Sequence, residues 1–409
     1  MEKYDVIVVG GGVLGLSAAY NCANAGKKVL VLEQYEFFNQ NGSSADFCRM
    51  WRVMYTGVYY AQMALDTSPM WDQLEKALGQ KLIDRSGLLN FGVNTPNTPE
   101  GTMEDAERVM KELKIPFTKL TSAQLMQQYP FRNLPSEYYG LYQANGGTID
   151  VQGVLRGYHN LAAAKGAVLK PWQWVTGIEP NATSVDVNVV ANTVTTTYRA
   201  DKVILCAGAF VNDLLAPWAI KVNLQIWEMT FAYYQVLDST RTYPMWFQFE
   251  DTPASGGSSL FYGFPSVTWA RPGYLRIAVD FASHVSDSPT DRTYVPAMQD
   301  IHLTMDYIQK HMVGVSTHPT QMATCLVPLV PDNGYVLDFA PPQVPNYDNV
   351  IVATAGWAYK FAPMFGSLLA ELAIKGTTTY DIMPMSITRP GVLVDLYPGE
   401  PARAGALAD

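Results

Sequence analysis

The start of the chain places two continuous apolar runs on either side of a segment of small residues. Val6–Val9 is apolar throughout, which is typical of a parallel strand buried on both faces. An alanine-rich helical segment runs from Leu14 to about Ala25, and a second apolar run, Val29–Leu32, ends at Glu33. This pattern predicts a strand–helix–strand unit.

A glycine-rich turn joins the first predicted strand to the helix. Gly10, Gly12 and Gly15 fit G-x-G-x-x-G, and the acidic Glu33 follows roughly 20 positions later. The first glycine allows a tight turn, the second lets a pyrophosphate approach, and the third lets the helix lie close to the strand. The helix N-terminus offers N–H groups to phosphates, and Glu33 can accept hydrogen bonds from a ribose. A chance glycine-rich turn is the alternative, but the flanking strands favour a dinucleotide site of the Rossmann type.

Buried-strand patterns return in the middle and near the end of the chain. Val203–Ala209 is an apolar run that ends in small residues, where a nucleotide can approach closely. Val350–Gly356 has the same character and precedes a predicted helix from Pro363 to Ile374. The first domain is therefore expected to be discontinuous, with one sheet that gathers strands from three parts of the chain.

The other segments carry weaker patterns. We predict helices at Tyr59–Leu78 and Val151–Lys165, strands at Ser86–Gly92 and Val168–Val175, a polar loop at Asn94–Thr102, and a hairpin within Thr183–Tyr198. From Leu224 to Phe281, aromatic and β-branched residues alternate with glycine and proline, which indicates an antiparallel sheet. The fold class expected is α/β with an α+β substrate domain.

The length of 409 residues favours two domains. We assign residues 1–85, 150–220 and 320–385 to the dinucleotide-binding domain and 86–149 and 221–319 to the substrate domain, with 386–409 as a C-terminal tail.

Composition excludes several classes of protein. Hydrophobic content of 48% and charged content of 16% are typical of a compact globular chain. A net charge of −9 without a basic tract argues against nucleic acid or an anionic membrane as partner. Neither a signal peptide nor a transmembrane run is recognisable, so we expect a cytoplasmic monomer acting on a small molecule. The four cysteines are not clustered, which supports neither a disulfide framework nor a metal site.

Two arginines follow the predicted dinucleotide unit. Arg49 and Arg52, three positions apart beside Trp51 and Tyr55, would share a helix face. A solvated helix edge is one interpretation. Anion recognition by arginines among aromatic residues is the other, and it is the one we favour.

Several local motifs together resemble the glutathione-reductase-type FAD fold and, within it, the sarcosine oxidase group of amine oxidases. The resemblance spans nearly the whole chain. Besides the dinucleotide motif it rests on Asn41-Gly42-Ser43 with Arg49 and Arg52, Phe261-Tyr262-Gly263-Phe264, Ala323-Thr324-Cys325, and Gly356-Trp357-Ala358-Tyr359-Lys360-Phe361.

A subgroup gives the closer match, the piperideine-2-carboxylate oxidases of nikkomycin biosynthesis, which make picolinate. The matching segments are Phe37-Phe38-Asn39, Trp51-Arg52, Gly147-Thr148-Ile149-Asp150-Val151, Arg276 to Asp280-Phe281, and Gly356-Trp357 ahead of Lys360.

The resemblance implies FAD as cofactor, attached covalently through Cys325, whose counterpart in the group carries the flavin on its sulfur. The cofactor-binding residues that we expect are Gly10, Gly12, Val13, Leu14, Gly15, Glu33, Gln34, Asn41, Ser43, Arg49, Val175, Ala207, Gly208, Cys325, Gly356, Trp357 and Lys360. The expected catalytic residues are Arg52, Glu100, Arg276, Asp280, Trp357 and Lys360.

The chain departs from sarcosine oxidases at the positions of four reactive side chains. Their oxygen-activating lysine falls on Arg276, and three of their histidines fall on Ala45, Asp280 and Trp357. No lysine lies between Lys221 and Lys310, so a small alignment shift restores none. These differences disfavour sarcosine turnover and favour the picolinate-type subgroup.

The roles expected for these residues follow from the needs of amine oxidation. Arg52 can grip a substrate carboxylate with two parallel hydrogen bonds, and Lys360 adds a point charge unless it is a surface lysine. Asp280 or Glu100 can accept the proton of the substrate nitrogen, although Glu100 in a polar loop also reads as a solvated charge. Trp357 either covers a substrate ring or fills core.

We therefore expect an oxidase of a cyclic or secondary 2-carboxy amine or imine, of the piperideine-2-carboxylate or L-pipecolate type, that serves secondary metabolism and reduces O2 to hydrogen peroxide. Arg276 would supply the positive charge that favours the oxygen reaction. The alternatives are an oxidase of N-methyl or other L-amino acids, an amino-acid dehydrogenase that uses an electron carrier, and a flavin-containing binding protein without catalysis.

Overall fold

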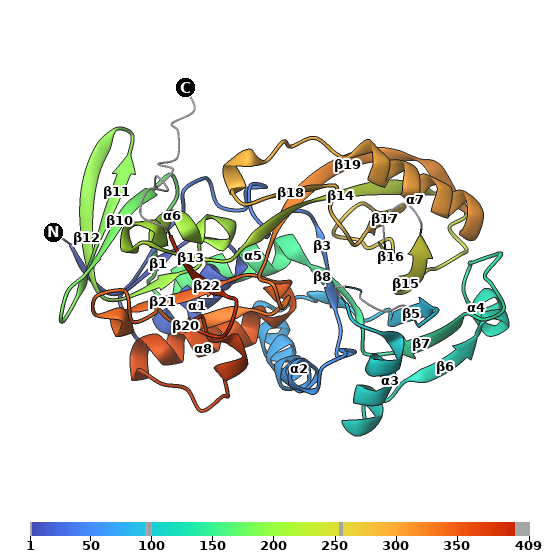
Figure 1. Ribbon diagram of the computed structural model, residues 1–409, viewed down its shortest axis with the longest axis horizontal. Coiled ribbons are helices and arrows are strands. Elements are labelled where there is room, and N and C mark those ends of the chain that lie inside the picture. Colours follow the sequence, from blue (N-terminus) through green and yellow to red (C-terminus); the bar gives the residue numbers. More distant parts are fainter. Residues whose placement is uncertain (1, 95–97, 99, 253–256, 397–409) are drawn as a thin grey trace.

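The computed structural model describes residues 2–94, 98, 100–252 and 257–396. Two large sheets lie toward opposite ends of an elongated molecule (Figure 1), one of eight strands and one of nine. Helix α2 (Val58–Leu78) lies between them in this view. The predicted combination of an α/β dinucleotide fold with a largely antiparallel second sheet is what the structure shows.

The eight-stranded sheet is built on the predicted strand–helix–strand unit. Strand β1 (Lys3–Val9) pairs in parallel with β2 (Val29–Leu32) and with β12 (Val194–Leu205). Helix α1 (Val13–Asn24) connects β1 to β2 and packs against α5 (Val151–Ala164) and α8 (Ala362–Lys375). The remaining strands are β9 (Val168–Lys170), β10 (Trp174–Pro180), β11 (Val185–Ala191), β20 (Val336–Phe339) and β21 (Val350–Thr354).

One strand joins the hairpin to the parallel sheet. The sequence predicts a hairpin that ends at Tyr198 and a separate strand from Val203, but β12 runs through both without a break. Its first half pairs antiparallel with β11, and residues 203–205 pair in parallel with β21. The predicted contribution of distant segments to one sheet is confirmed.

The nine-stranded sheet forms the other end of the molecule. Its strands are β5 (Leu88–Gly92), β6 (Thr118–Thr121), β7 (Tyr139–Gln143), β14 (Gln225–Val236), β15 (Met245–Thr252), β16 (Gly257–Phe264), β17 (Tyr274–Val279), β18 (His284–Ser286) and β19 (Val315–Leu329). The chain segments between its strands contain the helices α3 (Met103–Glu112), α4 (Ser122–Gln128) and α7 (Met298–His311). The predicted antiparallel character holds except where β15 pairs in parallel with β5.

Smaller elements complete the described chain. A three-stranded sheet consists of β3 (Cys48–Trp51), β8 (Gly147–Asp150) and β4 (Ile83–Asp84). Strand β13 (Ile220–Val222) pairs with β22 (Leu393–Asp395), and α6 (Val211–Leu215) precedes β13.

Two local predictions are wrong. Arg49 lies in strand β3 and Arg52 directly follows it, so the two do not share a helix face. Pairing with β8 overrides the helical spacing. The expected strand Val168–Val175 is two strands, because Pro171 and the left-handed Trp172 (φ 57°) interrupt it. The predicted loop Asn94–Thr102 lies partly outside the described residues.

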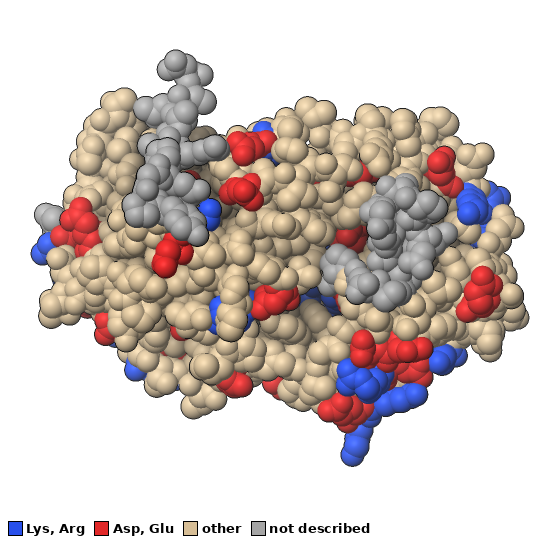
Figure 2. All heavy atoms as spheres, in the orientation of Figure 1, with Lys and Arg blue, Asp and Glu red and all other residues tan. Residues whose placement is uncertain are grey.

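Charges on the visible surface are mixed in sign. Figure 2 shows acidic and basic side chains side by side, most densely over α3, where Arg108 pairs with Asp105 and Lys111 pairs with Glu107. Such exposed pairs contribute little stability and give no field of a single sign. None of the described helices is long and apolar enough to cross a membrane.

The contact between α1 and the turn after β1 gives a stability prediction. A methyl group at Gly15 would come within 1.9 Å of the carbonyl oxygen of Gly10, so the helix and the turn must separate. We expect Gly15→Ala to lower the free energy of unfolding by about 3 kcal/mol, the upper end of the usual cost of overpacking. Urea denaturation followed by circular dichroism measures the change.

Gly57→Ala is the matched control, because a methyl group there meets nothing within 4 Å and the backbone needs no left-handed angle. Equal stability of the two variants would contradict this account of the contact.

Candidate active site

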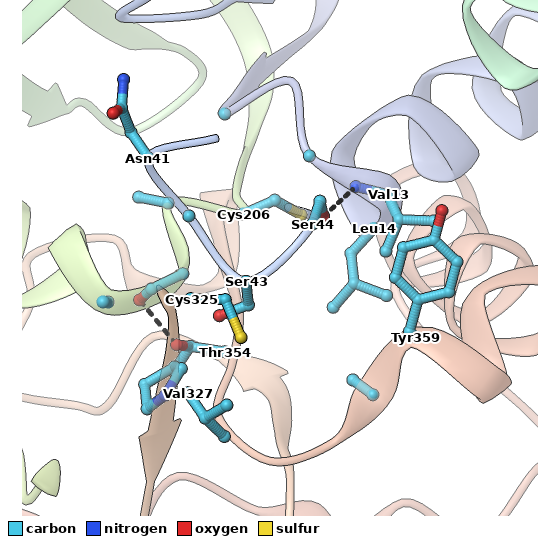
Figure 3. A pocket seen from close by; sticks show the side chains of 18 of the residues that line it. Val13, Leu14, Asn41, Ser43, Ser44, Cys206, Cys325, Val327, Thr354 and Tyr359 are labelled. Atoms are coloured by element: carbon cyan, nitrogen blue, oxygen red, sulfur yellow. Dashed lines mark hydrogen bonds between the residues drawn. The ribbon is translucent and has the colours of Figure 1, made fainter. Parts of the chain in front are cut away.

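The turn after β1 forms a cradle that only a bare backbone allows. Gly10 has φ 103°, and a methyl group there would lie 2.4 Å from the carbonyl oxygen of Cys206. Gly12 is the N-cap of α1 and gives no side-chain cap, so the first-turn N–H groups beyond that of Val13 point to a ligand site without a cap from Gly12. The N–H of Val13 donates to Ser44 Oγ at 3.1 Å, and Figure 3 shows this contact beside Leu14.

Glu33 stands at the end of β2 beside this cradle. Its Oε2 accepts the N–H of Gly11 at 2.6 Å, and its Oε1 accepts the N–H of Tyr35 at 3.0 Å. Burial raises the pKa of Glu33, while these hydrogen bonds act in the opposite direction. The carboxylate is thus held in place at the cavity wall, where a ribose hydroxyl could share it.

One continuous cavity runs from this cradle to the second sheet. Strand β19 brings Cys325 opposite Met229 of β14, and both residues line the cavity. Cys325 is a free, buried cysteine, and Figure 3 shows it among the lining side chains with Ser43 and Thr354. The cavity wall therefore carries a free thiol.

Four buried charged side chains, from separate parts of the chain, lie near one another in and beside the cavity wall. Arg52 forms an ion pair with Glu100, and both side chains are less than one-tenth exposed. The Arg52 guanidinium also lies 4.6 Å from the ring centre of Tyr55. Burial opposes the charge of Arg52, but Glu100 holds its pKa above the usual value. Asp280 and Lys360 line the same cavity and are 4% and 6% exposed.

Burial away from water shifts the pKa values of the acid and the amine in this region. Burial, with Glu100 nearby, raises the pKa of Asp280 to about 7. Burial, with Arg52 nearby, lowers the pKa of Lys360 to about 7. Asp280 Oδ2 has no hydrogen-bond partner among the described residues. Both groups can therefore exchange protons near neutral pH, which suits acid–base chemistry.

Arg276 occupies a second charged position on the cavity wall. Its Nε donates to Asp46 Oδ2 at 2.6 Å, and its guanidinium lies 4.4 Å from the ring centre of Phe231 and 5.1 Å from that of Phe264. The position expected for an oxygen-activating cation is therefore occupied by a cation that is already paired.

The predicted site residues converge on this cavity. Its lining includes Gly10, Gly12, Val13, Leu14, Glu33, Gln34, Asn41, Ser43, Arg49, Glu100, Val175, Ala207, Gly208, Arg276, Asp280, Cys325, Gly356, Trp357 and Lys360. Gly15 and Arg52 are not in the lining; the former supports the cradle and the latter stands behind Glu100. Trp357 is half-buried, and it both lines the cavity and packs against the core.

Sequence reasoning assigned no role to some residues that the structure brings into the site. Tyr262 and Phe264 line the cavity from one face of β16. Their spacing of two was a usable signal, because alternate residues of a strand share a face. Asp46 is different, since only the fold reveals that it meets Arg276, 230 positions away.

The residues present fit an FAD molecule. The glycine cradle and the free helix N-terminus suit a pyrophosphate, Glu33 suits a ribose, and the cavity continues to Cys325 and Lys360. Among the described residues no cluster of His, Cys, Asp and Glu side chains could hold a metal ion.

Comparisons with known proteins agree with this geometry. The profile of the DAO family, described as FAD dependent oxidoreductase, matches residues 5–372. The solved structure of NikD, "an unusual amino acid oxidase essential for nikkomycin biosynthesis", has 35% identity and a TM-score of 0.87 over 94% of this chain and 98% of that one.

Two curated relatives cover nearly all of the chain. The "Putative bifunctional amine oxidase" of Dictyostelium discoideum is 35% identical over 95% of this chain, which spans only 37% of that relative's length. The peroxisomal sarcosine oxidase of Homo sapiens is 26% identical over 95% of this chain and 96% of its own length.

These matches confirm the resemblance and the fold class expected from the sequence. The chain belongs to the DAO family of FAD-dependent oxidoreductases and is an amine or amino acid oxidase of the sarcosine oxidase type.

Proposed function

We propose that the chain oxidises a cyclic or secondary 2-carboxy amine or imine, of the piperideine-2-carboxylate or L-pipecolate type, toward picolinate. The observation that carries this proposal is the grouping of Asp280 and Lys360 in the cavity wall with Arg52, which pairs with the lining residue Glu100. A substrate carboxylate finds two cations there, Arg52 and Lys360, and a nitrogen proton finds an acceptor in Asp280. The 35% identity with NikD, described as an amino acid oxidase essential for nikkomycin biosynthesis, supports this proposal.

Arg52 and Lys360 bind the substrate carboxylate. Arg52 Nε is buried and has no hydrogen-bond partner among the described residues, so the guanidinium retains a donor for a ligand. Glu100 occupies another donor, Nη2, and a substrate carboxylate must share or displace it to form two parallel bonds. The Glu100 carboxylate thus occupies a place that the substrate carboxylate would take.

Asp280 accepts the proton from the substrate nitrogen. Loss of hydride from the carbon beside nitrogen requires the nitrogen lone pair, so the nitrogen must be neutral. Asp280 is buried, with a free oxygen, and its pKa is raised to about 7. A carboxylate tuned in this way can take a proton at neutral pH and hold it away from water.

The rings of Phe247, Tyr262 and Phe264 also line the cavity and offer apolar surface to a substrate ring. FAD, when bound, accepts the hydride and passes its electrons to O2, which gives hydrogen peroxide. Covalent attachment through Cys325 is part of the proposal, because that thiol lies in the cavity wall.

A dehydrogenase that passes electrons to a carrier is the second candidate. The pairing of Arg276 with Asp46 favours it, since a neutralised cation stabilises superoxide-like charge less well. Peroxide release in air from piperideine-2-carboxylate or L-pipecolate supports the oxidase. Turnover of these compounds only with an added electron acceptor supports the dehydrogenase, and turnover of sarcosine or aromatic amino acids alone contradicts the proposed substrate class.

Carboxylate recognition gives a prediction for Arg52 with the same substrate. Arg52→Ala should lower kcat/KM by about 2–4 kcal/mol of transition-state stabilisation, because it removes one partner of a buried charge pair. Arg52→Lys should recover only part of this, since lysine lacks the two-pronged geometry. An unchanged kcat/KM in Arg52→Ala would show that Arg52 does not bind the substrate carboxylate.

Covalent flavin gives a prediction for Cys325. Acid-precipitated wild-type protein should stay yellow, because a thioether survives denaturation and non-covalent FAD does not. Cys325→Ala should release its flavin into the supernatant on the same treatment. Cys206→Ala, which removes another cavity-lining cysteine, is the control and should keep its colour. Colourless wild-type precipitate would exclude covalent attachment.

The two shifted groups predict the pH dependence of kcat/KM. Asp280 must be ionised to accept a proton, so activity should rise as pH increases through about 7. Lys360 must be protonated to bind a carboxylate, so activity should fall as pH increases further beyond about 7. The profile should be a narrow bell centred near neutrality. Asp280→Asn should remove the rising limb, and a persistent rising limb in that variant would assign the proton to another group.

A further inference from the structure

The Arg276 guanidinium contacts aromatic rings and a carboxylate, but one of its nitrogen atoms has no hydrogen-bond partner among the described residues. Aromatic rings of Phe231, Tyr262 and Phe264 lie within 5.3 Å of its guanidinium carbon, measured to the ring centres. Its Nε is bound by Asp46. The Nη1 atom of Arg276 is buried and has no hydrogen-bond partner among the described residues. The Arg276 side chain lines the cavity described above.

Asp46 is itself fixed more firmly than a single ion pair requires. Its Oδ1 accepts the hydroxyl of Tyr233 at 2.7 Å, and its Oδ2 accepts Arg276 Nε at 2.6 Å. Arg49 Nη1 lies 3.6 Å from the same Oδ2. Burial and the nearby Asp46 raise the pKa of Tyr233, so this hydroxyl stays protonated and remains a donor.

The backbone at Asp46 is fixed as well. Its N–H donates to Gln40 Oε1 at 2.7 Å, and its carbonyl oxygen accepts from Gln152 Nε2 at 3.3 Å. The residue has φ 74°, a left-handed conformation that costs a non-glycine residue about 1–3 kcal/mol unless its surroundings enforce it. The loop that carries Ser43 and Ser44 to the cavity therefore ends in a carboxylate of fixed direction.

The charges in this group do not cancel. Arg49 and Arg276 carry two positive charges, and Asp46 is the one acid with which either forms an ion pair among the described residues. Removal of the negative charge would leave two guanidinium groups on the cavity wall without a counter-ion, the buried Arg276 and the half-buried Arg49. The potential at a flavin in the cavity would become more positive, which favours the reduced, more negative form of the flavin.

We propose that Asp46 is a positioning residue for flavin chemistry: it aims Arg276 so that its free Nη1 faces the cofactor, and it sets how much of the Arg276 charge the flavin experiences. This inference rests on the proposed function only in taking FAD as the occupant of the cavity that Arg276 lines. In sarcosine oxidases the position of Arg276 holds the oxygen-activating lysine. Here Asp46 would fix the direction of the Arg276 cation and partly neutralise its charge.

The reduction potential of the bound flavin tests this proposal, measured by equilibration with a reference dye without substrate. Asp46→Asn should favour reduction at least tenfold, a rise of about 30 mV for a two-electron couple. Arg276→Met should move the potential in the opposite direction. Asp338→Asn is the control, because Asp338 is bound by Ser386 and Ile387 outside the cavity lining, and its variant should keep the wild-type potential.

A purely structural role for Asp46 predicts a different result. Asp46→Asn would then lower the melting temperature while leaving the potential and the flavin absorbance spectrum unchanged, and that outcome would overturn the proposal. If Asp46→Asn does not fold, Asp46→Glu keeps the charge and displaces the guanidinium by one methylene. An unchanged potential in Asp46→Glu would equally overturn it. Because no substrate is present, a wrong substrate assignment leaves these measurements unaffected.

Discussion

The close approach of α1 to the turn after β1 is the contact on which the rest of the site depends. Gly15 leaves room for the carbonyl of Gly10, and Gly10 in turn leaves room for the carbonyl of Cys206. Three backbone segments therefore meet where side chains would keep them apart. This contact aims the N-terminus of α1 into the cavity, and the same strand order carries Glu33, Ala207 and Gly356 to the same edge of the sheet.

Burial of charge is the second constraint. Arg52, Asp280, Lys360 and Arg276 are each less than one-tenth exposed, and isolated ions would be costly there. The protein meets this cost in two ways. Arg52 and Arg276 keep their charges beside carboxylates, whereas Asp280 and Lys360 shift their pKa values toward neutrality. Fixed charges that orient a substrate thus lie near groups that can exchange a proton.

The sequence was most informative where local pattern and chemistry coincide. The glycine motif, the apolar runs and Cys325 each carry their meaning in a few neighbouring residues, and the structure brings them to one cavity. Arg49 and Arg52 were placed on a helix because their spacing suits one, but pairing with β8 decides the conformation there. The partner of Arg276 could not be predicted, because Asp46 reaches it only through the packing of a distant loop.

The position of Cys325 has a mechanical consequence. The cradle for the pyrophosphate belongs to the eight-stranded sheet, whereas Cys325 lies on β19, which pairs with β14 of the nine-stranded sheet. Residues of both sheets line the one cavity, so a molecule that fills it would contact both halves of the molecule. Such a molecule would add to the link that the Asp46–Arg276 ion pair already makes between the loop before β3 and strand β17.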